Sequence, residues 1–521
     1  MTSNLPPYFN FAQHIISTNS IRPNKIAIID DLGTVTYGKL SNLICSFAEG
    51  LHQFGLKQED RVLLLMHDSS DWVVAFLGCL YAGVIPVVAN TLLTTNDYAF
   101  IIKDSRVKSV LVSSALLPTL EKSLEQIEHK VQHILVSRHP DNLTQNAYHF
   151  SDFLKFDNTR FTPASTLGDE PAFWLYSSGS TGQPKGTIHT QRNLYYSVEL
   201  FGKTILKLKE NDIVFSTAKL FFAYGLGNSL TQTLSAGASS VLTAARPTPE
   251  VIFDQLIEHQ VTIFFSAPTG YIGMLANDNI PDKNKIKLRL CFSGGEALPY
   301  SIAKRWSEYA DCEIIDCIGS TEMLTMFISN QPGNVRYGTT GKPVPGYEVQ
   351  LRGEQGDVIT GHNEIGDLYI KGPTAALMYW NNREKTRDTF QGEWTKSGDK
   401  YMRDSEGYYI YVGRNDDMLK VSGIYVSPFE VESTLVQHPA ILEAAVIGTI
   451  DADGLTKTKA FIVLKSGQSL TEEEVKVFVK SQLASYKYPR LIEFVDNLPK
   501  TSTGKLQRFR LRNMNKNEQQ S

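Results

Sequence analysis

Residues 176–186 read Tyr176-Ser177-Ser178-Gly179-Ser180-Thr181-Gly182-Gln183-Pro184-Lys185-Gly186 and continue an apolar run, 172–176, that predicts a buried strand. The glycines let backbone N–H groups approach an anion closely, and the serine and threonine hydroxyls add further donors. Lys185 adds a positive charge. The order differs from a Walker A loop, because no Gly-Lys-Ser/Thr follows four residues after a glycine. We therefore predict a phosphate-binding loop, the alternative being a flexible surface loop of this composition.

The segments on either side of this loop predict an α/β fold. Before residue 165, predicted buried strands at 61–66, 84–88, 107–112 and 130–136 alternate with predicted helices at 71–81 and 116–128. The polar stretch 137–169 is interpreted as a connector. After the loop the pattern resumes, with a helix that starts after Thr248 and strands at 212–217, 261–266, 288–293 and 313–317. The large body is therefore expected to contain two α/β halves.

The chain changes character after Gly341. Alternating runs at 348–351, 366–371 and 408–412 are bounded by glycines and predict a small antiparallel sheet or barrel. A compact α+β unit follows Arg414, with capping boxes that begin helices at Ser427 and Thr471 and strands at 444–448, 460–464 and 491–495. The polar tail 513–521 is expected to lack regular structure. We predict an N-terminal domain, 1–415, with two α/β sheet subdomains and a β-barrel-like subdomain, and a mobile C-terminal domain, 416–521.

The composition excludes several classes of protein. A chain of 521 residues should hold about three or four folding units. It is 42% hydrophobic and 20% charged with a net charge of −4, so it lacks the basic excess typical of nucleic-acid-binding proteins. The five cysteines lack metal-type spacing and are expected to be reduced core residues, which suits the cytoplasm. The N-terminus lacks a signal core, and glycines and a proline interrupt the apolar stretch 72–89, so we expect no export and no membrane anchor.

Two turns of the second half end predicted strands. In Ser293-Gly294-Gly295-Glu296, the two glycines permit a flat ligand to approach the backbone closely. The turn Gly319-Ser320-Thr321-Glu322 follows the strand that contains Asp316. Ligands of open α/β sheets bind at the carboxyl ends of the strands, where such turns lie. Glu322 is either a surface carboxylate or, beside a triphosphate, a ligand for Mg²⁺, which prefers oxygen ligands.

Three later motifs also carry candidate binding groups. Ser397-Gly398-Asp399 places a carboxylate on a turn, where it can accept hydrogen bonds from both hydroxyls of a ribose. The segment Gly413-Arg414-Asn415-Asp416-Asp417 is either a charged surface turn or a ribose or phosphate contact, Arg414, followed by a pivot, Asp416. Near the C-terminus, Lys505 follows Gly504 and can reach another domain's site from a mobile loop, although a lone lysine is commonly solvated.

Taken in order, these six motifs resemble those of the adenylate-forming superfamily, which includes acyl- and aryl-CoA ligases, luciferases and peptide-synthetase adenylation domains. The resemblance covers nearly the whole chain and implies ATP and Mg²⁺ as cofactors. It implies that Glu322 and Thr181 bind the metal, that Asp399 and Arg414 bind the ribose, that Asp416 is a hinge, and that Lys505 bridges carboxylate and phosphate. The implied catalytic residues are Lys505, Lys185, Thr181, Glu322 and Asp416. The implied nucleotide- and CoA-binding residues are Ser177, Ser178, Gly179, Ser180, Thr181, Gly182, Lys185, Gly294, Gly295, Glu296, Asp316, Gly319, Ser320, Thr321, Asp399, Arg414, Lys420 and Gly423.

A closer resemblance is to the benzoate-CoA ligase family and its hydroxybenzoate and anthranilate relatives. It rests on residues 218–228, 316–324 and 341–347, with Ile318 where many superfamily members have an aromatic residue. It implies an acyl pocket lined by Phe222, Ala223, Tyr224, Gly295, Leu324 and Met326. An apolar slot with aromatic walls suits an aryl ring, although Phe222 and Tyr224 alone can equally be core residues. One departure is Thr325-Met326, where benzoate ligases usually have His-Ile, and it leaves the accepted ring substituents open.

The resemblance implies a reaction in two steps. ATP converts a carboxylate to an acyl-adenylate with release of pyrophosphate, and the thiol of coenzyme A then displaces AMP. It also implies that the C-terminal domain rotates about Asp416, so that the surface around Lys420 to Gly423 lines access for the thiol. The implied partners are an aryl carboxylate, ATP and CoA, with neither nucleic acid nor membrane; a homodimer is one assembly that it allows.

Three other functions remain open from the sequence. The acyl group can be handed to the phosphopantetheine of a separate carrier protein instead of free CoA. Alternatively, the chain can be a non-catalytic binding relative, although the retained Lys185, Glu322 and Lys505 argue against that reading. Luciferase-type oxidation would use the same motifs, but the benzoate-like pocket segment argues against it.

Overall fold

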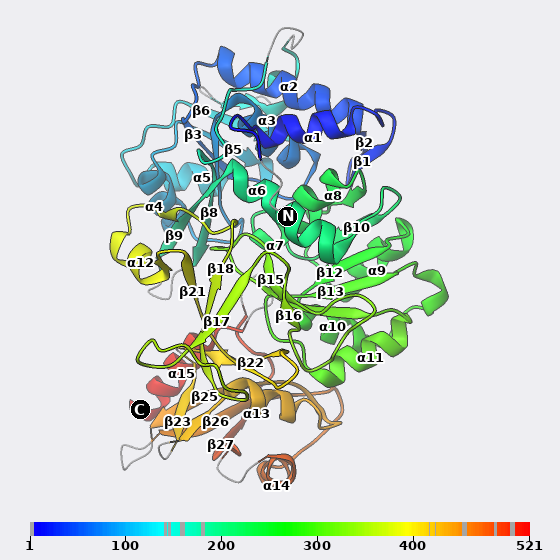
Figure 1. Cartoon of the computed structure of the whole chain (residues 1–521), viewed down its shortest axis with the longest axis vertical. Helices are drawn as coiled ribbons and strands as arrows, with labels where there is room; N and C mark the ends of the chain where they lie inside the picture. Colours follow the sequence, from blue (N-terminus) through cyan, green and yellow to red (C-terminus); the bar gives the residue numbers. More distant parts are fainter. Residues whose placement is uncertain are drawn as a thin grey trace.

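A computed structural model gives the arrangement of the chain (Figure 1). It describes residues 5–139, 143, 147–156, 162–178, 183–415, 417–421, 424–450, 456–483, 487–500 and 506–520. Three sheets and their helices form the upper body in this view, and a smaller unit carries the C-terminus below it. This arrangement confirms the predicted fold class: two α/β sheets, a small β subdomain and a small α+β unit.

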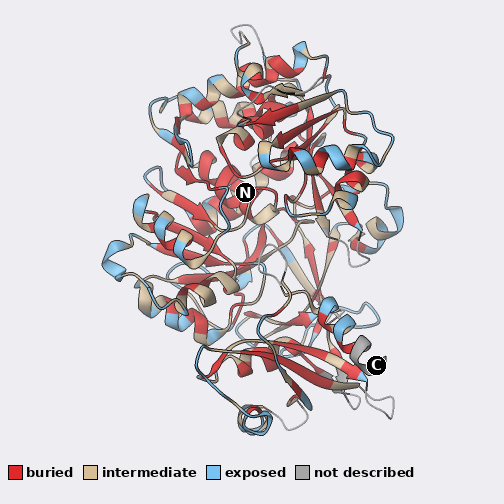
Figure 2. Ribbon diagram, turned by 180° about the vertical axis from the view of Figure 1, so that it is seen from behind, coloured by how far each residue is buried: buried red, intermediate tan, exposed pale blue. Residues whose placement is uncertain are grey.

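The first sheet has eight strands in the order β19-β9-β8-β4-β3-β5-β6-β7. Continuous apolar runs form its central parallel strands, which are buried on both faces (Figure 2). The strands are β3 (Arg61–Leu65), β4 (Ile85–Val88), β5 (Ser109–Ser113), β6 (His133–Ser137), β7 (Ala147–His149), β8 (Pro171–Ser178), β9 (Pro184–Thr190) and β19 (Met378–Tyr379). The helices before and between them are α1 (Phe11–Asn19), α2 (Tyr37–Gln53), α3 (Ser70–Ala82), α4 (Thr95–Ser105) and α5 (Leu117–Leu124), with a short turn η1 (Ser114–Leu116).

The stretch that we interpreted as a connector is partly structured. It contains β7, which pairs in parallel with β6, and the 3₁₀ turn η2 (Phe150–Leu154). Phe150 and Phe153 are buried and pack against Phe47 of α2, so two aromatic side chains fix this segment to the core. The interpretation of 137–169 as a plain connector was therefore wrong in part.

The second sheet has nine strands in the order β16-β15-β14-β13-β12-β10-β11-β1-β2. The strands are β1 (Ile26–Asp30), β2 (Gly33–Thr36), β10 (Ile213–Ser216), β11 (Ser239–Val241), β12 (Ile263–Ser266), β13 (Leu290–Ser293), β14 (Ile314–Gly319), β15 (Met326–Ser329) and β16 (Lys342–Pro343). The accompanying helices are α6 (Gln191–Ser197), the π-helical η3 (Val198–Leu206), α7 (Ala223–Gly225), the π-helical η4 (Leu226–Gln232), α8 (Thr233–Ser235), α9 (Pro249–Glu258), α10 (Pro268–Leu275), η5 (Lys283–Lys285) and α11 (Tyr300–Ala310). Thr248 caps α9, with Pro249 at its first position, as the sequence predicted.

The third sheet is antiparallel throughout its pairings. It comprises β17 (Glu348–Arg352), β18 (Gly366–Lys371), β20 (Phe390–Gln391), β21 (Trp394–Arg403) and β22 (Tyr409–Arg414), with α12 (Arg383–Thr389) beside it. Its apolar face shares one core cluster with residues of the second sheet, including Phe292 and Phe327. Asp399, in the middle of β21, pairs with Arg414 at the end of β22 and so lies close to the start of the C-terminal unit.

The C-terminal unit is built from a hairpin, a three-stranded sheet and three helices. Its elements are β23 (Leu419–Val421), β24 (Ile424–Val426), α13 (Pro428–Leu435), β25 (Ile441–Ile450), β26 (Thr456–Leu464), α14 (Glu472–Gln482), β27 (Leu491–Phe494) and α15 (Arg508–Gln520). Thr471 and Glu474 form the predicted capping box, whereas Ser427 caps α13 while Glu430 pairs with Lys487 instead.

The expectation that 513–521 lacks regular structure was wrong, because α15 continues to Gln520. Leu511 is buried against the three-stranded sheet, and the Asn515 side chain donates to Thr449 and accepts from Lys459. These long-range contacts stabilise a helix whose polar composition gives little evidence of it.

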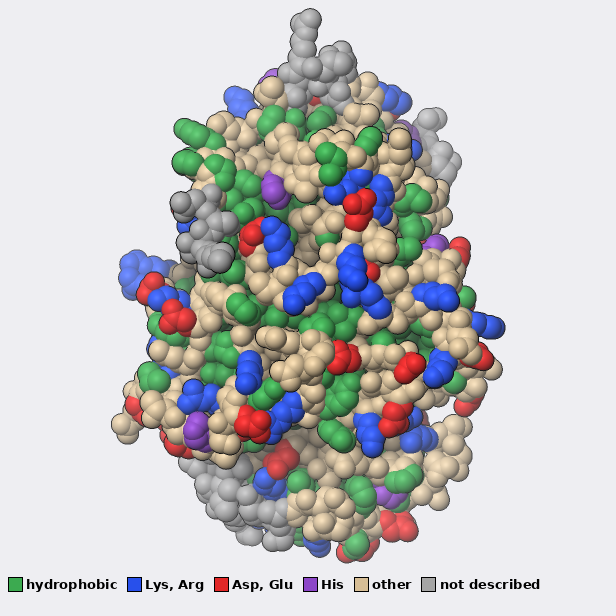
Figure 3. Space-filling model, turned by 45° about the vertical axis from the view of Figure 1, so that its right-hand side comes forward, with side chains coloured by type: hydrophobic (Ala, Val, Ile, Leu, Met, Phe, Trp, Pro, Cys, Tyr) green, Lys and Arg blue, Asp and Glu red, His purple; other side chains and the backbone are tan. Residues whose placement is uncertain are grey.

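The surface charges and the cysteines agree with the expectations from composition. On the face shown in Figure 3, basic and acidic side chains are interspersed. Within the described ranges, no helix is both long and apolar enough to cross a bilayer. The cysteines are free thiols, three of them buried and two half-buried, as expected.

Candidate functional site

The candidate site lies where the first two sheets meet. β8 ends at the predicted phosphate loop, and Ser293 and Gly319 end the neighbouring strands β13 and β14. Carboxyl ends of parallel strands from both α/β halves therefore face the same region, as expected for a ligand crevice of an α/β fold. The described part of the phosphate loop includes Ser177 and Lys185, while Gly179, Ser180, Thr181 and Gly182 lie outside the described residues.

Lys185 and Glu322 form the polar centre of the site. The Lys185 Nζ atom lies 3.1 Å from Glu322 Oε1 and donates to the Tyr379 hydroxyl at 2.9 Å. The Tyr379 hydroxyl in turn donates to Glu322 Oε1 at 2.6 Å, and its ring centroid lies 4.2 Å from the lysine Nζ. The three side chains come from β9, the turn after β14 and the edge strand β19, so this contact joins the two halves.

The charge of this cluster is fixed by its contacts. Burial raises the pKa of Glu322, but the charge of Lys185 and the Tyr379 hydrogen bond outweigh burial and lower the pKa to about 2. Burial and the Glu322 charge raise the pKa of Tyr379, so its hydroxyl stays protonated and donates. Glu322 is therefore a carboxylate at neutral pH, the form that can bind a cation.

Sequence reasoning did not identify Tyr379, and replacing it tests its contribution. Tyr379→Phe keeps the ring over Lys185 but removes the hydrogen bond to a charged oxygen, which is worth roughly 1.5–3 kcal/mol. For the adenylate-forming reaction that the sequence resemblance implies, we expect kcat/KM for ATP to fall about 10-fold. Pyrophosphate exchange measures this rate. Tyr309→Phe, which removes a hydroxyl bonded to the Pro281 carbonyl far from the site, is the matched control; equal rates in both variants would contradict the role.

His189 is a second residue that the sequence did not reveal. It is buried on β9, stacks on Phe173, and its Nε2 atom lies 2.8 Å from the Thr321 carbonyl oxygen. Burial lowers its pKa to about 4, so the imidazole is neutral and holds the Gly319–Glu322 turn by hydrogen bonding rather than by charge. A single histidine within a strand carries no sequence signal of this contact.

The Gly-Gly-Glu turn makes room for an aromatic wall. A Cβ atom at Gly294 would lie 3.1 Å from the Tyr224 ring, and Gly295 has a φ of +92°, so both positions favour glycine. The Tyr224 hydroxyl donates to the Phe292 carbonyl at 3.4 Å, which orients the ring beside β13. The glycines thus let an aromatic side chain stand directly against the turn.

The other predicted acyl-pocket residues fall in two adjoining apolar clusters. Phe222, Ala223 and Leu324 belong to one cluster, and Tyr224 and Met326 to the other. Leu324 has a φ of +61°, a left-handed conformation that is uncommon for a bulky residue and is concentrated at functional sites. The preceding turn depends on Gly319, because a Cβ there would lie 2.6 Å from the Thr325 carbonyl oxygen.

Asp68 connects the first half of the protein to the acyl-pocket segment. It is buried after β3, and its Oδ1 atom accepts the Leu220 N–H at 3.0 Å, one residue before Phe221. Burial raises the pKa of Asp68 to about 6, although the charge of Lys219 lowers it. Asp68 therefore holds the loop that contains Leu220 in place, but its buried negative charge lowers the stability of the folded protein at neutral pH.

Asp68→Asn is expected to stabilise the protein at pH 8. The pKa of Asp68 is higher in the folded protein than its unfolded value of 3.8. The folded protein therefore loses stability as pH rises from about 4 to 6, because the unfolded chain releases this proton more readily. The amide keeps an acceptor for Leu220 without the charge. We expect a gain of about 1–3 kcal/mol at pH 8 that vanishes near pH 4. Unfolding midpoints at both pH values test this, and a gain that does not depend on pH would contradict it.

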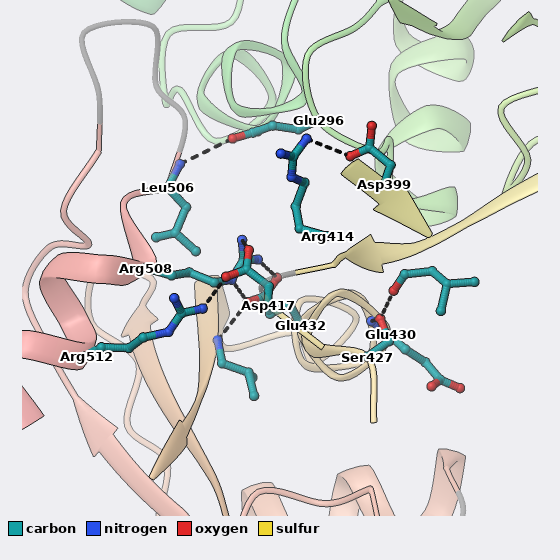
Figure 4. Close-up of polar contacts among 12 residues, drawn as sticks. Glu296, Asp399, Arg414, Asp417, Ser427, Glu430, Glu432, Leu506, Arg508 and Arg512 are labelled. Carbon is teal, nitrogen blue, oxygen red and sulfur yellow. Dashed lines mark hydrogen bonds and ion pairs between the residues drawn. The ribbon is translucent and has the colours of Figure 1, made fainter. Parts of the chain in front are cut away.

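The predicted nucleotide contacts lie on two sides of the site. Asp316 is buried, its Oδ1 atom has no partner among the described residues, and burial raises its pKa. Asp399 and Arg414 form an ion pair at 3.0 Å at the end of the β21–β22 pair (Figure 4). Glu296 accepts the Leu506 N–H at 3.4 Å, a contact between the large body and the C-terminal unit.

Several predicted residues cannot be placed. Asp416, Gly423 and Lys505 lie outside the described residues, and only the backbone of Lys420, in β23, is described. The described residues on either side of 501–505 contact each other: Lys500 pairs with Leu506, and the Gln507 N–H donates to the Pro499 carbonyl at 2.8 Å. The Ser177 hydroxyl is buried without a partner among described residues, and Ser320 accepts the Met323 N–H at 3.1 Å.

Comparisons with known proteins agree with this geometry. Residues 17–380 match the AMP-binding enzyme family, and residues 430–505 match the AMP-binding enzyme C-terminal domain. A benzoate–CoA ligase of Thauera aromatica is 49% identical over 514 residues, covering 98% of this chain and 96% of that protein. A crystal structure of a benzoate CoA ligase from Burkholderia xenovorans LB400 is 51% identical, with a TM-score of 0.90 over 97% of this chain and 100% of that one. The anthranilate CoA ligase AuaEII in complex with anthranoyl-AMP is 40% identical, with a TM-score of 0.95 over the whole of both chains.

Proposed function

Because the chain belongs to the AMP-binding enzyme family, we propose that it is an ATP-dependent aryl-CoA ligase. It activates benzoate or a substituted benzoate as the acyl-adenylate, with release of pyrophosphate. It then transfers the acyl group to coenzyme A, giving aryl-CoA and AMP. Relatives named for benzoate and anthranilate, each similar over nearly the whole chain, support an aryl acid as the substrate.

One observation carries the aryl assignment. The Tyr224 ring lies directly against Gly294, and Leu324, after the Gly319–Glu322 turn, has a left-handed backbone conformation. We infer that these two side chains form a flat apolar surface beside the turn that the ligand approaches. An aryl ring packs well on such a surface, whereas a short aliphatic acid would leave part of it uncovered. We propose that Phe222, Ala223, Tyr224, Gly295, Leu324 and Met326 line the acyl pocket.

The first step must bring two anions together, the carboxylate and the triphosphate. Lys185, the backbone amides of residues 177–182 and Lys505 would supply the positive field that holds them. The charged Glu322 carboxylate and the Thr181 hydroxyl are oxygen donors that suit Mg²⁺, and the ion would offset the charge of the phosphates. With both reactants fixed, positioning supplies much of the remaining acceleration.

We propose that the nucleotide lies between Asp316 and Asp399. The unpartnered Asp316 oxygen is suited to accept a donor such as the adenine amino group. Asp399 and Arg414 already face each other at the β21–β22 pair and would bind the ribose. The sequence resemblance adds six further residues to this proposed nucleotide site: Gly179, Ser180, Gly182, Gly319, Ser320 and Thr321.

The second step requires the thiol to reach the adenylate. We propose that domain 416–521 rotates against domain 1–415 about Asp416, which withdraws Lys505 and brings forward the surface around Lys420 and Gly423. Such a rotation acts as a gating step between the two half-reactions. We further propose that the enzyme works in the cytoplasm, and that a homodimer is its assembly.

The proposal is tested by AMP formation with MgATP and a panel of aryl and short aliphatic acids, with and without CoA. CoA-dependent turnover on an aryl acid is the expected result. Pyrophosphate release that CoA does not accelerate would point to the phosphopantetheine of a carrier protein as acceptor. Turnover restricted to aliphatic acids, or no turnover with any acid, would overturn the aryl-CoA ligase assignment.

A further inference from the structure

A cluster of four charged side chains lies directly after the predicted pivot. It consists of Asp417, Glu432, Arg508 and Arg512, here termed the Asp417 clamp (Figure 4). Arg508 and Arg512 come from α15, one helical turn apart, and Glu432 comes from α13. The clamp thus connects the chain that enters the C-terminal unit to the helix that follows the Lys505 segment.

The contacts of the clamp are close; Glu432 is buried, and the other three side chains are half-buried. The Arg508 Nη2 atom lies 2.6 Å from Glu432 Oε2. The Arg508 Nη1 atom lies 3.4 Å from Asp417 Oδ2. Arg512 pairs with the other oxygen of Asp417. Glu432 also accepts the Val446 N–H at 2.7 Å, so the clamp is tied to β25 in the core of the unit. Breaking a buried ion pair leaves an uncompensated charge, which is strongly destabilising.

The residues just before the pivot are attached to the large body instead. Arg414 pairs with Asp399, and the Asn415 N–H donates to the Gly398 carbonyl at 3.0 Å. The chain is therefore bound to the large body up to Asn415 and to the C-terminal unit from Asp417 onward. Two backbone bonds cross this point, from the N–H groups of Asp417 and Met418 to the Arg414 carbonyl, each 3.1 Å.

Other contacts between the described parts of the two bodies are of a different kind. Ser427 donates to the Val412 carbonyl, the Tyr411 and Phe429 rings meet edge to face at 5.2 Å, and Leu506 donates to Glu296. A rotation of the C-terminal unit would break these contacts, whereas every member of the Asp417 clamp moves with that unit.

We propose that Asp417, held by Arg508 and Arg512, is a positioning residue that confines the rotation to one point and makes α15, the helix that follows Lys505 in the chain, turn with the C-terminal unit as a rigid part. This inference rests on the proposed two-step function. Arg508 lies three residues after Lys505, so its contact with Asp417 connects the pivot to the base of the lysine segment across the interior of the unit. Without the clamp, residues 417–418 would join the pivot, and the lysine would reach the large body with less defined geometry.

Two variants test the clamp while sparing the buried Arg508–Glu432 pair. Asp417→Asn keeps the shape and removes the charge, and Arg512→Gln removes the partner at the surface end. We expect each to lower kcat for adenylate formation about 5- to 20-fold, as misplacement of a catalytic group does, with KM for ATP unchanged because the ATP contacts lie mainly on the large body. The double variant should be no worse than Asp417→Asn alone, because the Asp417–Arg512 pair that Arg512→Gln removes is already lost in that variant. Glu493→Gln is the control, since its 2.8 Å pair with Lys459 lies in the same unit away from the pivot.

A measurement of distance separates this inference from the proposed function. Spin labels at Lys304 on α11 and Glu473 on α14 report the separation of the two bodies, in a background with Cys45 and Cys312 replaced by serine. We expect narrow distance populations for the wild type and a broadened distribution for Asp417→Asn, with the control unchanged. An unbroadened distribution, or multiplicative effects in the double variant, would overturn the clamp even if ligase activity is confirmed. Absence of adenylate formation in the wild type would instead refute the proposed function and leave the distance result to decide the clamp.

Discussion

Lys505→Ala is expected to lower the rate of acyl-adenylate formation about 10²- to 10³-fold, the loss typical of removing one preorganised charge from a reaction that develops negative charge. The thiol-transfer step, started from supplied acyl-adenylate, should retain its rate, because the proposed rotation withdraws the lysine from the site before this step. Pyrophosphate exchange measures the first step, and release of AMP from supplied adenylate in the presence of CoA measures the second.

The control for Lys505 is Lys476→Ala, which removes a half-buried lysine paired with Glu472 on α14. It should leave both half-reactions unchanged. Equal losses in the two half-reactions of Lys505→Ala would show that the lysine contributes to folding or to the pocket in general. Its assignment to adenylation would then have to be abandoned.

Glu322→Gln is expected to have the second large effect. The amide keeps the size of the side chain but removes the charge that pairs with Lys185, and a neutral group binds Mg²⁺ poorly. We expect adenylate formation to fall about 10²-fold or more, with partial recovery at high Mg²⁺ concentration. Rates measured across a Mg²⁺ titration test this, and a loss that does not depend on Mg²⁺ would argue that Glu322 only positions Lys185.

The same variant has a pH signature in stability. Because the folded pKa of Glu322 is lowered from 4.5 to about 2, its charge contributes stability that is present above pH 4.5 and is lost as pH falls toward 2. Glu322→Gln should therefore be less stable than the wild type by about 2–3 kcal/mol at pH 7, with the gap narrowing below pH 4.5. Urea unfolding at pH 7 and at pH 4 compares the two.

Much of the fold was predictable because the central strands are continuous apolar runs. The predictions for β3, β12, β13 and β14 each overlap the observed strand, since strands buried on both faces need apolar residues at every position. The order of glycine-rich motifs also indicated which strand ends carry the site. These are local signals, and they can be read without knowing what packs against them.

The features that could not be predicted depend on contacts between distant parts of the chain. Tyr379 reaches Lys185 only because β19 pairs with β9, where Tyr379 lies opposite Thr187. A two-residue strand has no periodicity to detect. His189 likewise depends on a carbonyl of another sheet, and α15 depends on Leu511 and Asn515 meeting the three-stranded sheet. In each case tertiary packing decides what local propensity leaves open.

The pairing of β1 with β11 has a consequence for how the protein is made. Ile28 lies opposite Ser240, which is 212 positions later in the chain (240 − 28). At the usual speed of synthesis, about 5–20 residues per second, the first strands emerge from the ribosome roughly 10–40 s before their partner exists. During that time the hairpin of β1 and β2 leaves the β1 edge, which later pairs with β11, exposed to other nascent chains. Expression should therefore be sensitive to chaperones that shield early segments, even though β11 covers this edge at Ile28 and Ile29 in the finished protein.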